Sequence, residues 1–560
     1  MTTSDDDEMT GFGGGQGILA GYPIADEVVT TQRRTIVPGP APSGSDVVLP
    51  YEVSKYKSHG YGNWSYGPGL AHERRMDLIP DEHSAHYMVT DSRLLSFFTM
   101  SDIHICDKES PVQLIFYGYK GGFSSAYSPV MLYTTQVLDA AVQTINALHK
   151  QTPFDFGISL GDAANNTQLN ELRWYIDVLD GGPIIPQSGN ADDPIPGLAN
   201  DYQDAFEAVG LDKSIPWYQA LGNHDQFMIG TLPVNDYIRA HYTGTEILNL
   251  GNLLVDHPGV DSRGFYMGAI DGSTPDGDVF GAGPVSDFAV PPQVSAADPN
   301  RRSLTKSEWM AEFFYTSSLP IGHGFNRANT EDGFACYSFL PNRNIPIKVI
   351  VLDDTQDPSN PDVDGYGHGY IDTQRYDWLL AELERGQAED QLMIIAAHVP
   401  IGVENPGSYI GWSPIAPITE EQFIAKLQTY PNLIAWLAGH RHYNAVTAMK
   451  SPDPSRPELG FWQIETSSLR DFPQQFRTFT ISRNSDNTIS ITTTNVDPAV
   501  EKGSLAAQSR FFAVAAQQIF DNKVGRPPSG SYNAELVIPL SPRMQQTISN
   551  CGTALLEWPA

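Results

Sequence analysis

Short apolar runs that each end in a cluster of polar residues recur along this chain, with helical patterns between them. Apolar strands that alternate with amphipathic helices predict an α/β layered fold with buried sheets. In such folds ligands bind beyond the carboxyl ends of the strands, so we expect the polar clusters to meet in space. The runs are RLLSFFTMSDIH (93–104), FDFGISLGDAAN (154–165), IPWYQALGNHD (215–225), IPIKVIVLDD (345–354), LMIIAAHVP (392–400) and NLIAWLAGHRH (432–442).

Three segments carry apolar residues at three- and four-residue steps, which is typical of helices: 128–150, 373–387 and 419–430. Thr419 stands where an N-cap belongs, with acidic residues in the turn after it. The sequence after residue 455 predicts β-strands joined by a turn at NSDN. The tail predicts one helix, SLAAQSRFFAVAAQQIF, and one strand, AELVIPL.

The pattern divides the chain into three predicted parts. Residues 1–92 are rich in Gly, Pro and Tyr, and we expect an irregular extension that wraps the core or is partly disordered. Residues 93–497 form the predicted core, and 498–560 form a C-terminal extension packed on it. Within the core, residues 226–344 are a long loop-rich insertion, a length that is usually a functional lid or substrate wall.

The run GHRH places His440 and His442 directly after an apolar segment. In an extended chain, residues i and i+2 point to the same side, so the two imidazoles suit two neighbouring metal ligands. The alternative is an ordinary pair of surface histidines, because short motifs also occur by chance.

Four other polar clusters carry residues of the same kinds. A single Asp or His after a strand is usually incidental, but five clusters at one pole of a sheet favour a metal site. Carboxylate, imidazole and amide ligands suit divalent Mn, Fe, Zn, Ni or Co, and the three cysteines are too few for a Cys-rich zinc site. The residues are Asp102, His104, Asp162, Asn223, His224, Asp225 and His398.

The order D-x-H, G-D, G-N-H-D, H and G-H-x-H resembles that of the calcineurin-like metallophosphoesterase superfamily, over about residues 93–497. The resemblance implies a four-layer α/β/β/α sandwich with two divalent or mixed-valence metal ions, for which Mn, Fe and Zn are the first candidates. It implies that one metal is bound by Asp102, His104, Asp162 and His442. It implies that the other is bound by Asp162 as a shared bridge and by Asn223, His398 and His440.

The same resemblance implies a hydrolase acting on ester bonds, a phosphatase or phosphodiesterase. Its substrate would be a small phosphomonoester or phosphodiester, attacked by a hydroxide that bridges the two metals. His224 would lie beside the substrate without binding metal and protonate or stabilise the leaving oxygen. The alternative is a non-catalytic metal-binding or scaffold protein on the same fold.

Two positions depart from better-known subfamilies. Purple acid phosphatases carry a metal-binding Tyr three residues after the G-D aspartate, where this chain has Asn165. Ser/Thr protein phosphatases carry G-D-x-x-D-R-G, whereas this chain reads GDAANNT. The chain is most similar to a bacterial subgroup with long inserts between the motifs and usually a twin-arginine leader.

Three further residues near the motifs have competing interpretations. Arg441 points away from the two flanking histidines, so we expect a structural salt bridge rather than a phosphate contact. Asp107 and Asp225 are candidates for orienting the ligands, with ordinary surface aspartates as the alternative.

The composition limits which kinds of molecule the protein is expected to bind. With 34 Lys and Arg against 66 Asp and Glu, the formal net charge is −32, which argues against a long nucleic acid as partner. No apolar run reaches 18 residues, so no membrane span is expected. The sequence as given has no leader, which favours a cytoplasmic location; the alternative is export after removal of a twin-arginine leader. The oligomeric state is not predicted.

Overall fold

The computed structural model describes most of the chain. Its shortest described stretches, residue 193 and residues 195–197, lie in one loop between residues 184 and 206. The residues described are 28–44, 47–80, 89–121, 124–190, 193, 195–197, 200–251, 264–359, 366–403, 411–520 and 533–554.

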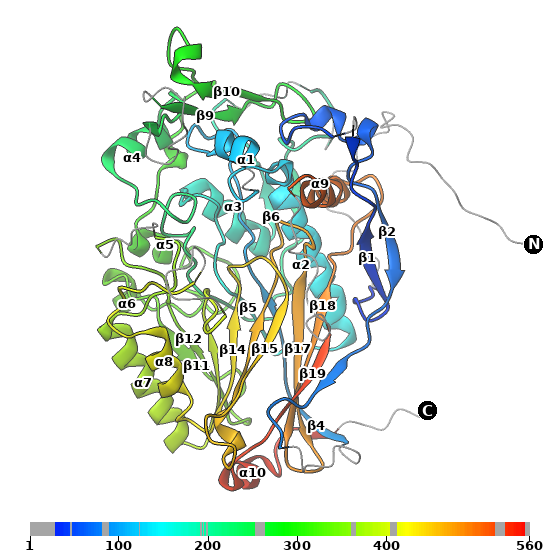
Figure 1. The fold of residues 1–560 in the computed structure, drawn as a ribbon, viewed down its shortest axis with the longest axis vertical. Helices are drawn as coiled ribbons and strands as arrows, with labels where there is room; N and C mark the ends of the chain where they lie inside the picture. The colour runs from blue at the N-terminus through cyan, green and yellow to red at the C-terminus, as the bar shows by residue number, and fades with distance from the viewer. Residues whose placement is uncertain are drawn as a thin grey trace, which may run out of the picture.

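The larger of two main sheets has eight strands and joins segments from both ends of the chain (Figure 1). Its long strand β4 (Thr90–Met100) pairs antiparallel with β17 and parallel with β5. The predicted C-terminal strand is present as β19, which pairs with β18 inside this sheet. The order is β3 (Glu73–Arg75), β19 (Ala534–Ile538), β18 (Ile489–Val496), β17 (Phe476–Asn484), β4, β5 (Phe156–Ser159) and β8 (Trp217–Gln219), with β20 (Thr553–Ala554) beside β4.

The smaller main sheet has six strands, of which β12, β13, β14 and β16 are mutually parallel and β11 and β15 are antiparallel edges. Its parallel strands are buried along their whole length and mostly apolar, as expected of a sheet covered on both faces. The order is β11 (Tyr337–Phe339), β12 (Ile347–Val351), β13 (Leu392–Ala396), β14 (Leu433–Ala438), β16 (Phe461–Glu465) and β15 (Ala445–Met449).

The two main sheets pack face to face between two layers of helices. Phe97 and Phe479 of the larger sheet share one core cluster with Val349 of the smaller sheet and with the apolar faces of α2 and α3. The next residue of β12, Ile350, faces the other way, into a second cluster with α7 and α8. The layers are therefore α/β/β/α, which confirms the expected fold class. Figure 1 shows α7 and α8 on the opposite side of the strands from α2.

The layer helices confirm the predicted patterns, with shifts at their ends. Segment 128–150 begins as a 3-10 helix, Pro129–Tyr133, because Ser128 caps it and Pro129 follows, and continues as α2. Thr419 caps α8 in a capping box with Gln422. The helices are α2 (Thr134–Gln151), α3 (Leu169–Asp180), α7 (Thr373–Ala388), α8 (Glu420–Leu427) and the tail helix α9 (Leu505–Ile519).

The insertion 226–344 contains more regular structure than its loop-rich sequence suggested. Its strands β9 (Phe265–Ile270) and β10 (Val279–Pro284) pair antiparallel and lie near α1 (Ile115–Gly121). Phe116 of α1 stacks on Phe265, with ring centroids 4.8 Å apart. The insertion also holds α4 (Asp236–Thr243), α5 (Lys306–Glu312), α6 (Arg327–Glu331) and the core-sheet strand β11. Its role as a lid or wall stays a prediction.

The described part of the N-terminal segment forms strands as well as loops. It contains β1 (Arg34–Pro38), paired with β2 (Trp64–Pro68), and the core-sheet strand β3. Tyr56 from this segment packs on Phe512 of α9, so the two ends of the chain meet. The remaining elements are β6 (Gly182–Ile184), β7 (Phe206–Ala208) and α10 (Pro542–Ile548). The three-part division of the chain stays a prediction, and residues 1–27 lie outside the described residues.

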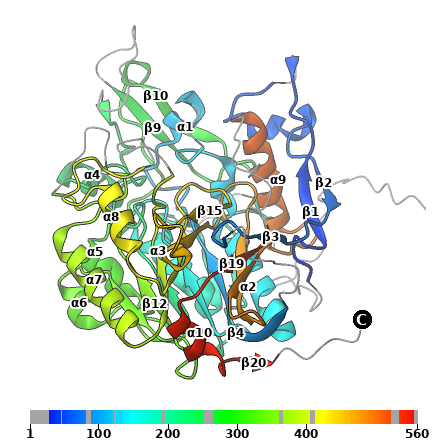
Figure 2. The same ribbon diagram turned by 60° about the horizontal axis from the view of Figure 1, so that its bottom comes forward.

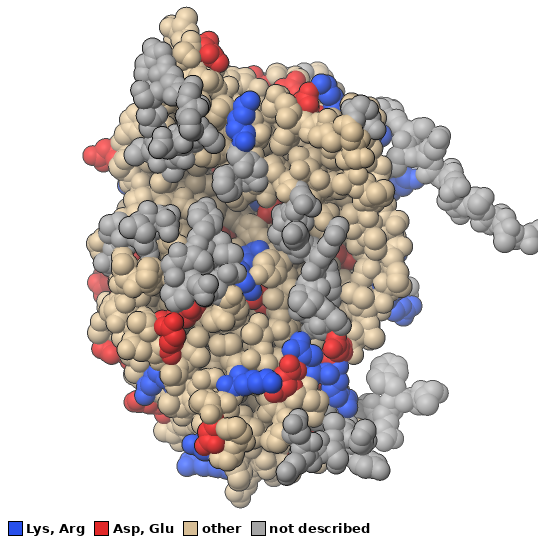
Figure 3. All heavy atoms as spheres, in the orientation of Figure 1, with Lys and Arg blue, Asp and Glu red and all other residues tan. Residues whose placement is uncertain are grey.

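The neighbouring strands β4, β5 and β8 of the larger sheet are parallel, so they share one direction relative to the poles of the molecule. β20 pairs with the beginning of β4 near α10, at the pole that Figure 2 brings forward. The carboxyl ends of β4 and β5 therefore point away from that pole. Figure 3 shows a hollow near the middle of one face, with charged side chains of both signs around it. Among the described residues, no helix is both long and apolar enough to cross a bilayer.

Candidate metal centre

The predicted metal ligands all follow the carboxyl ends of core strands, and the structure brings them together. Five strands from both sheets contribute, so the site lies where the two sheets meet. Asp102 and His104 follow β4, Asp162 follows β5, Asn223 follows β8, His398 follows β13, and His440 and His442 follow β14.

The backbone at these loops is unusual. Asp102, His104, Asp162, His440 and His442 all have a positive φ, between 49° and 68°. Non-glycine residues rarely adopt this conformation, which costs on the order of 1–3 kcal/mol each and clusters at functional sites. The fold therefore holds five predicted ligands in strained positions, which is hard to explain by packing alone.

Two glycines of the motifs make the close approach possible. A Cβ on Gly222 would lie 2.1 Å from Asp162 Oδ1, and one on Gly439 would lie 1.8 Å from Ser101 Oγ. Both distances are shorter than any real contact, so these positions accept only glycine. The Gly in LGNHD and in AGHRH thus allows neighbouring ligand loops to touch.

One group of ligand atoms surrounds Asp102. His442 Nε2 lies 3.3 Å from Asp102 Oδ1 and 3.1 Å from His104 Nε2. His104 Nε2 lies 4.0 Å from the same Asp102 oxygen. The ligand atoms of these three residues all lie within 4.8 Å of one another, as a shared cation requires.

A second group surrounds Asn223. Its Oδ1 lies 2.8 Å from His398 Nε2 and 3.2 Å from His440 Nδ1. The amide itself is oriented by its Nδ2, which donates to the carbonyl oxygen of Gly230 at 3.1 Å. The acceptor oxygen of Asn223 therefore faces two imidazole nitrogens, as a ligand oxygen would.

Asp162 lies between the two groups. Its Oδ2 is 3.6 Å from His104 Nε2 in the first group and 3.3 Å from His398 Nε2 in the second. Its Oδ1 accepts a hydrogen bond from the backbone N–H of His224 at 2.9 Å, which fixes the carboxylate. One buried oxygen thus faces both sets of ligands.

Hydrogen bonds at the far side of the rings set which nitrogen faces the centre. His398 Nδ1 donates to the carbonyl oxygen of Leu160 at 2.8 Å, and His442 Nδ1 donates to Asp471 Oδ2 at 2.6 Å. In both rings Nε2 is left to face the ligand cluster, the arrangement usual for metal-binding histidines.

His224 is oriented in the same way but lies at the edge of the cluster. Its Nδ1 lies 2.7 Å from the carbonyl oxygen of Asn165, to which it donates. Its ring meets that of His104 edge-on, with centroids 4.4 Å apart, and a ligand nitrogen of His224 also falls within 4.8 Å of His104 and Asp162 ligand atoms. Burial lowers its pKa.

The electrostatics of the site suit divalent cations. Burial would raise the pKa of Asp162, but His398 and then His224 outweigh burial and hold it well below its usual value. Burial would lower the pKa of His398, but Asp162 outweighs burial and raises it to about 10. Burial, and then His398, lower the pKa of His440 to about 3. The carboxylates thus favour the protonated, positively charged form of His398. Divalent cations would supply positive charge to the same carboxylates.

The donor set also fits metals. It consists of two carboxylates, four imidazoles and one amide oxygen, a combination that suits borderline divalent ions. Two buried ring nitrogens, His104 Nδ1 and His440 Nε2, have no hydrogen-bond partner.

Several supporting residues were not found from the sequence. Asp354 accepts hydrogen bonds from the backbone N–H groups of His398 at 3.1 Å and Val399 at 3.0 Å. Asp471 orients His442, and the fully buried Arg470 donates to Asn165 Oδ1 at 3.0 Å. The sequence signal that could have identified these residues is their position after β12 and β16, at the same sheet edge as the ligands.

The structure gives the partners of the three residues that had competing interpretations, Arg441, Asp225 and Asp107. Arg441 donates to both oxygens of Glu465, each at 2.6 Å, which is the expected salt bridge. Asp225 accepts the backbone N–H of Asp162 at 2.9 Å and so supports a ligand loop. Asp107 is fully buried, which excludes the surface alternative, and it accepts hydrogen bonds from Ser188 and Asn170; among the described contacts it meets no predicted ligand, so its orienting role stays a prediction.

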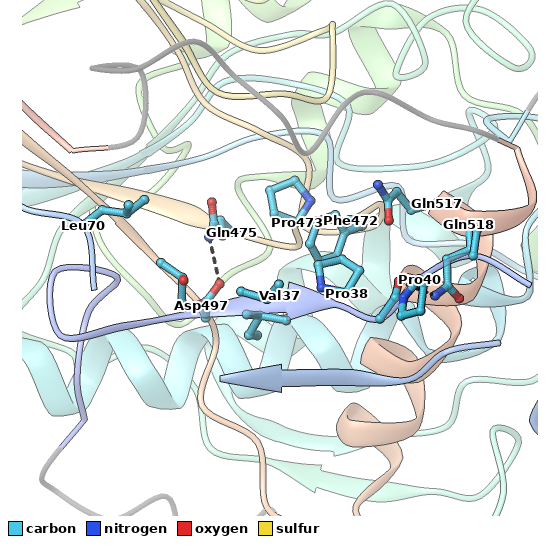
Figure 4. A pocket seen from close by; sticks show the side chains of 14 residues that line it. Val37, Pro38, Pro40, Leu70, Phe472, Pro473, Gln475, Asp497, Gln517 and Gln518 are labelled. Carbon is cyan, nitrogen blue, oxygen red and sulfur yellow. Dashed lines mark hydrogen bonds between the residues drawn. The ribbon is translucent and has the colours of Figure 1, made fainter. Parts of the chain in front are cut away.

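A separate cavity of about 430 Å³ lies between β1 and the loop after Arg470. Figure 4 shows Phe472, Pro473 and Gln475 on one side of it and Val37 and Pro38 on the other. None of the predicted metal ligands lines it, so it is not the candidate centre.

Comparison with solved structures finds a dimetal phosphatase from Danio rerio, 10% identical, with a TM-score of 0.38; the match covers 73% of this chain and 97% of that one. It also finds the "Putative 5'-Nucleotidase from Staphylococcus aureus", 11% identical, with a TM-score of 0.31; the match covers 74% of this chain and 57% of that one. No family model and no curated protein matches the sequence. With both TM-scores below 0.5, the evidence for the site is its own geometry.

Proposed function

We propose that this protein is a metal-dependent phosphoesterase that hydrolyses a small phosphomonoester or phosphodiester at a dinuclear metal centre. The observation that carries the proposal is the position of Asp162 Oδ2, which faces His104 Nε2 on one side and His398 Nε2 on the other. A single oxygen between two separate ligand groups suits two cations that share a bridge.

The seven predicted ligands take the roles that the geometry supports. One metal would be held by Asp102, His104, Asp162 and His442, and the other by Asp162, Asn223, His398 and His440. The metals are divalent or mixed-valence ions, with Mn, Fe and Zn as our first candidates.

The bound metals would supply a water ionised near neutral pH and positive charge for the phosphate; lowering a water pKa from about 15.7 to about 7 is worth on the order of 12 kcal/mol. The residues of the chain hold and orient this centre. Asp162 is fixed by the His224 backbone N–H, and Asp471 and Leu160 fix two of the imidazoles.

His224 is the proposed catalytic acid. Its Nδ1 is committed to the Asn165 carbonyl oxygen, so any proton that it gives to the leaving oxygen comes from Nε2. A positioned acid or base contributes about 10²- to 10⁴-fold, or about 3–5 kcal/mol, which is less than the contribution of the metal pair. Arg470 holds Asn165 from its other side and so supports the position of His224.

The test is hydrolysis of p-nitrophenyl phosphate and bis-p-nitrophenyl phosphate by protein reconstituted with Mn²⁺, Fe²⁺ or Zn²⁺, with metal content measured in parallel. We expect about two metal ions per chain and turnover of at least one substrate. A single turnover in ¹⁸O-water should place the label in the released phosphate, because water attacks phosphorus directly. Two bound metals with no turnover of any substrate would favour the non-catalytic scaffold.

A further inference from the structure

A second candidate metal site lies in the loop between β6 and β7, away from the histidine cluster. Asp193, Asp201 and Asp204 bring a carboxylate oxygen each to within 4.8 Å of one another. None of the three belongs to the ligand groups of the candidate metal centre. Carboxylate clusters are common on protein surfaces, so the burial of this one decides its meaning.

Asp201 is the buried member of the cluster. Its side chain is only 2% exposed, and its Oδ2 is closed to water and has no hydrogen-bond partner. Its other oxygen, Oδ1, accepts the backbone N–H of Gln203 at 2.8 Å. A buried carboxylate oxygen without a donor is costly, and two nearby carboxylates add repulsion. Burial raises the pKa of Asp201. The backbone hydrogen bond from Gln203 lowers it, and the charge of Asp204 raises it again, so that the pKa is raised overall.

The neighbouring groups offset the charge of the cluster only in part: burial, Asp204 and Asp193 raise the pKa of Asp201 and outweigh the charge of Lys108, which lowers it. The nearby Lys108 ammonium donates to the carbonyl oxygens of Pro186 and Tyr202. Among the described residues, no side-chain cation forms an ion pair with these three carboxylates.

The geometry also leaves ligand atoms free. Asp204 uses Oδ2 to accept the backbone N–H groups of Asn200 at 2.6 Å and Asp201 at 3.3 Å, which leaves its Oδ1 available. Asp193 is exposed and opens the cluster to solvent, so an ion has a path of entry. All the candidate ligands are oxygens, the preference of a hard cation that accepts six to eight of them.

We propose that Asp193, Asp201 and Asp204 bind a calcium ion, independently of the dinuclear centre. The ion would satisfy the buried Asp201 oxygen and fix the loop against the core. The same loop reaches the core through Ser188, whose Oγ donates to Asp107 at 2.8 Å and whose N–H donates to Glu109 at 2.8 Å. Calcium is therefore expected to stabilise the folded chain, because an ion that binds only the folded state raises its stability.

The test is calcium titration of the full chain by calorimetry, after the dinuclear centre has been loaded with Mn²⁺. We expect one calcium site and an upward shift of the thermal unfolding midpoint with added Ca²⁺. Asp193→Asn, Asp201→Asn and Asp204→Asn should each weaken calcium binding at least tenfold without changing the Mn²⁺ content. Asp193 is exposed, so its variant keeps the test valid if the Asp201 variant folds poorly.

Asp212→Asn is the matched control, because Asp212 accepts the N–H of Ser214 at 2.9 Å in the same kind of turn but lies outside the cluster. Its calcium affinity should equal that of the unmodified chain. Absence of calcium binding, or equal binding by the three cluster variants and the control, would overturn the proposal. Calcium bound only when Mn²⁺ is displaced would overturn it too, and leave the proposed phosphoesterase activity untouched.

Discussion

Two buried clusters of charge lie within a few residues of each other in the sequence and differ in how their polar atoms are satisfied. In the network around Asp107, the carboxylate accepts hydrogen bonds from Ser188 Oγ and Asn170 Nδ2, both at 2.8 Å, and lies 3.5 Å from Arg301 Nε. Glu171 beside it accepts the N–H of Asp107 at 2.8 Å. Both carboxylates are matched by donors within the protein, and Arg301 Nη2 is a buried donor of this network without a hydrogen-bond partner.

The ligand cluster that begins at His104 is different. Its carboxylates and imidazoles crowd together, with His104 Nε2 and His442 Nε2 only 3.1 Å apart, and ring nitrogens of His104 and His440 lack partners. Asp107 and Asp102 are both fully buried, so burial of a carboxylate alone does not mark a metal site. What marks it is a set of carboxylate, imidazole and amide ligand atoms that converge on one another.

The largest effect is expected at the atom that joins the two ligand groups. Asp162→Asn should reduce turnover by about 10³-fold or more, because the loss of a shared ligand removes several kcal/mol of transition-state stabilisation. It should also weaken both metals. Steady-state kinetics and elemental analysis of the purified variant check both effects. Full activity with two metals bound would contradict the bridging role.

Loss of the proposed acid should have a smaller effect of a different kind. His224→Ala should lower kcat by about 10²- to 10⁴-fold while the metal content stays at the unmodified level. The reason is that His224 is predicted to donate a proton rather than to bind metal. Kinetics with a good leaving group should show less loss than with a poor one. Loss of one metal ion would instead make His224 a ligand.

A residue outside the ligand set should act on metal affinity. Asp471→Asn removes the charge that orients His442 through a 2.6 Å hydrogen bond. Such partners are worth about 10- to 100-fold in metal affinity or activity. Competition with a chelator measures the change, and Asp453→Asn, at an exposed turn, is the control. Equal metal retention in both variants would refute the orienting role.

A substitution in the network around Asp107 should lower the stability of the fold and leave metal binding unchanged. Asp107→Asn leaves Arg301 without its carboxylate, and breaking a buried ion pair costs about 3–5 kcal/mol. We expect a lower free energy of unfolding in urea, with the metal content of the folded variant unchanged. Metal loss at unchanged stability would mean that this network belongs to the metal centre.

The order of the motifs made the core layout and the ligands predictable. The strand ends before Asp102, Asp162 and His440 are short apolar runs closed by a polar cluster, and parallel strands bring such ends to one edge. The fold class and the layer helices followed from the same alternation. The roles of the ligands stay proposals that rest on the positions of their side chains.

The supporting residues could not be predicted in the same way. Asp354 and Asp471 act on backbone N–H groups and ring nitrogens 29 to 44 positions away along the chain, and nothing in the local sequence names those partners. The partners of Asp107 could not be predicted either. It follows the D-x-H motif closely, yet the chain turns it toward Ser188 and Asn170, away from the ligands. Sequence distance from a motif is a poor guide to which side of a loop a side chain takes.

The most direct test is the anomalous difference map of a crystal of this protein soaked in Mn²⁺. Two strong peaks should flank Asp162 Oδ2, one beside Asp102, His104 and His442 and the other beside Asn223, His398 and His440. A map without peaks at these side chains, or with a single peak that leaves one group unused, would contradict a dinuclear centre.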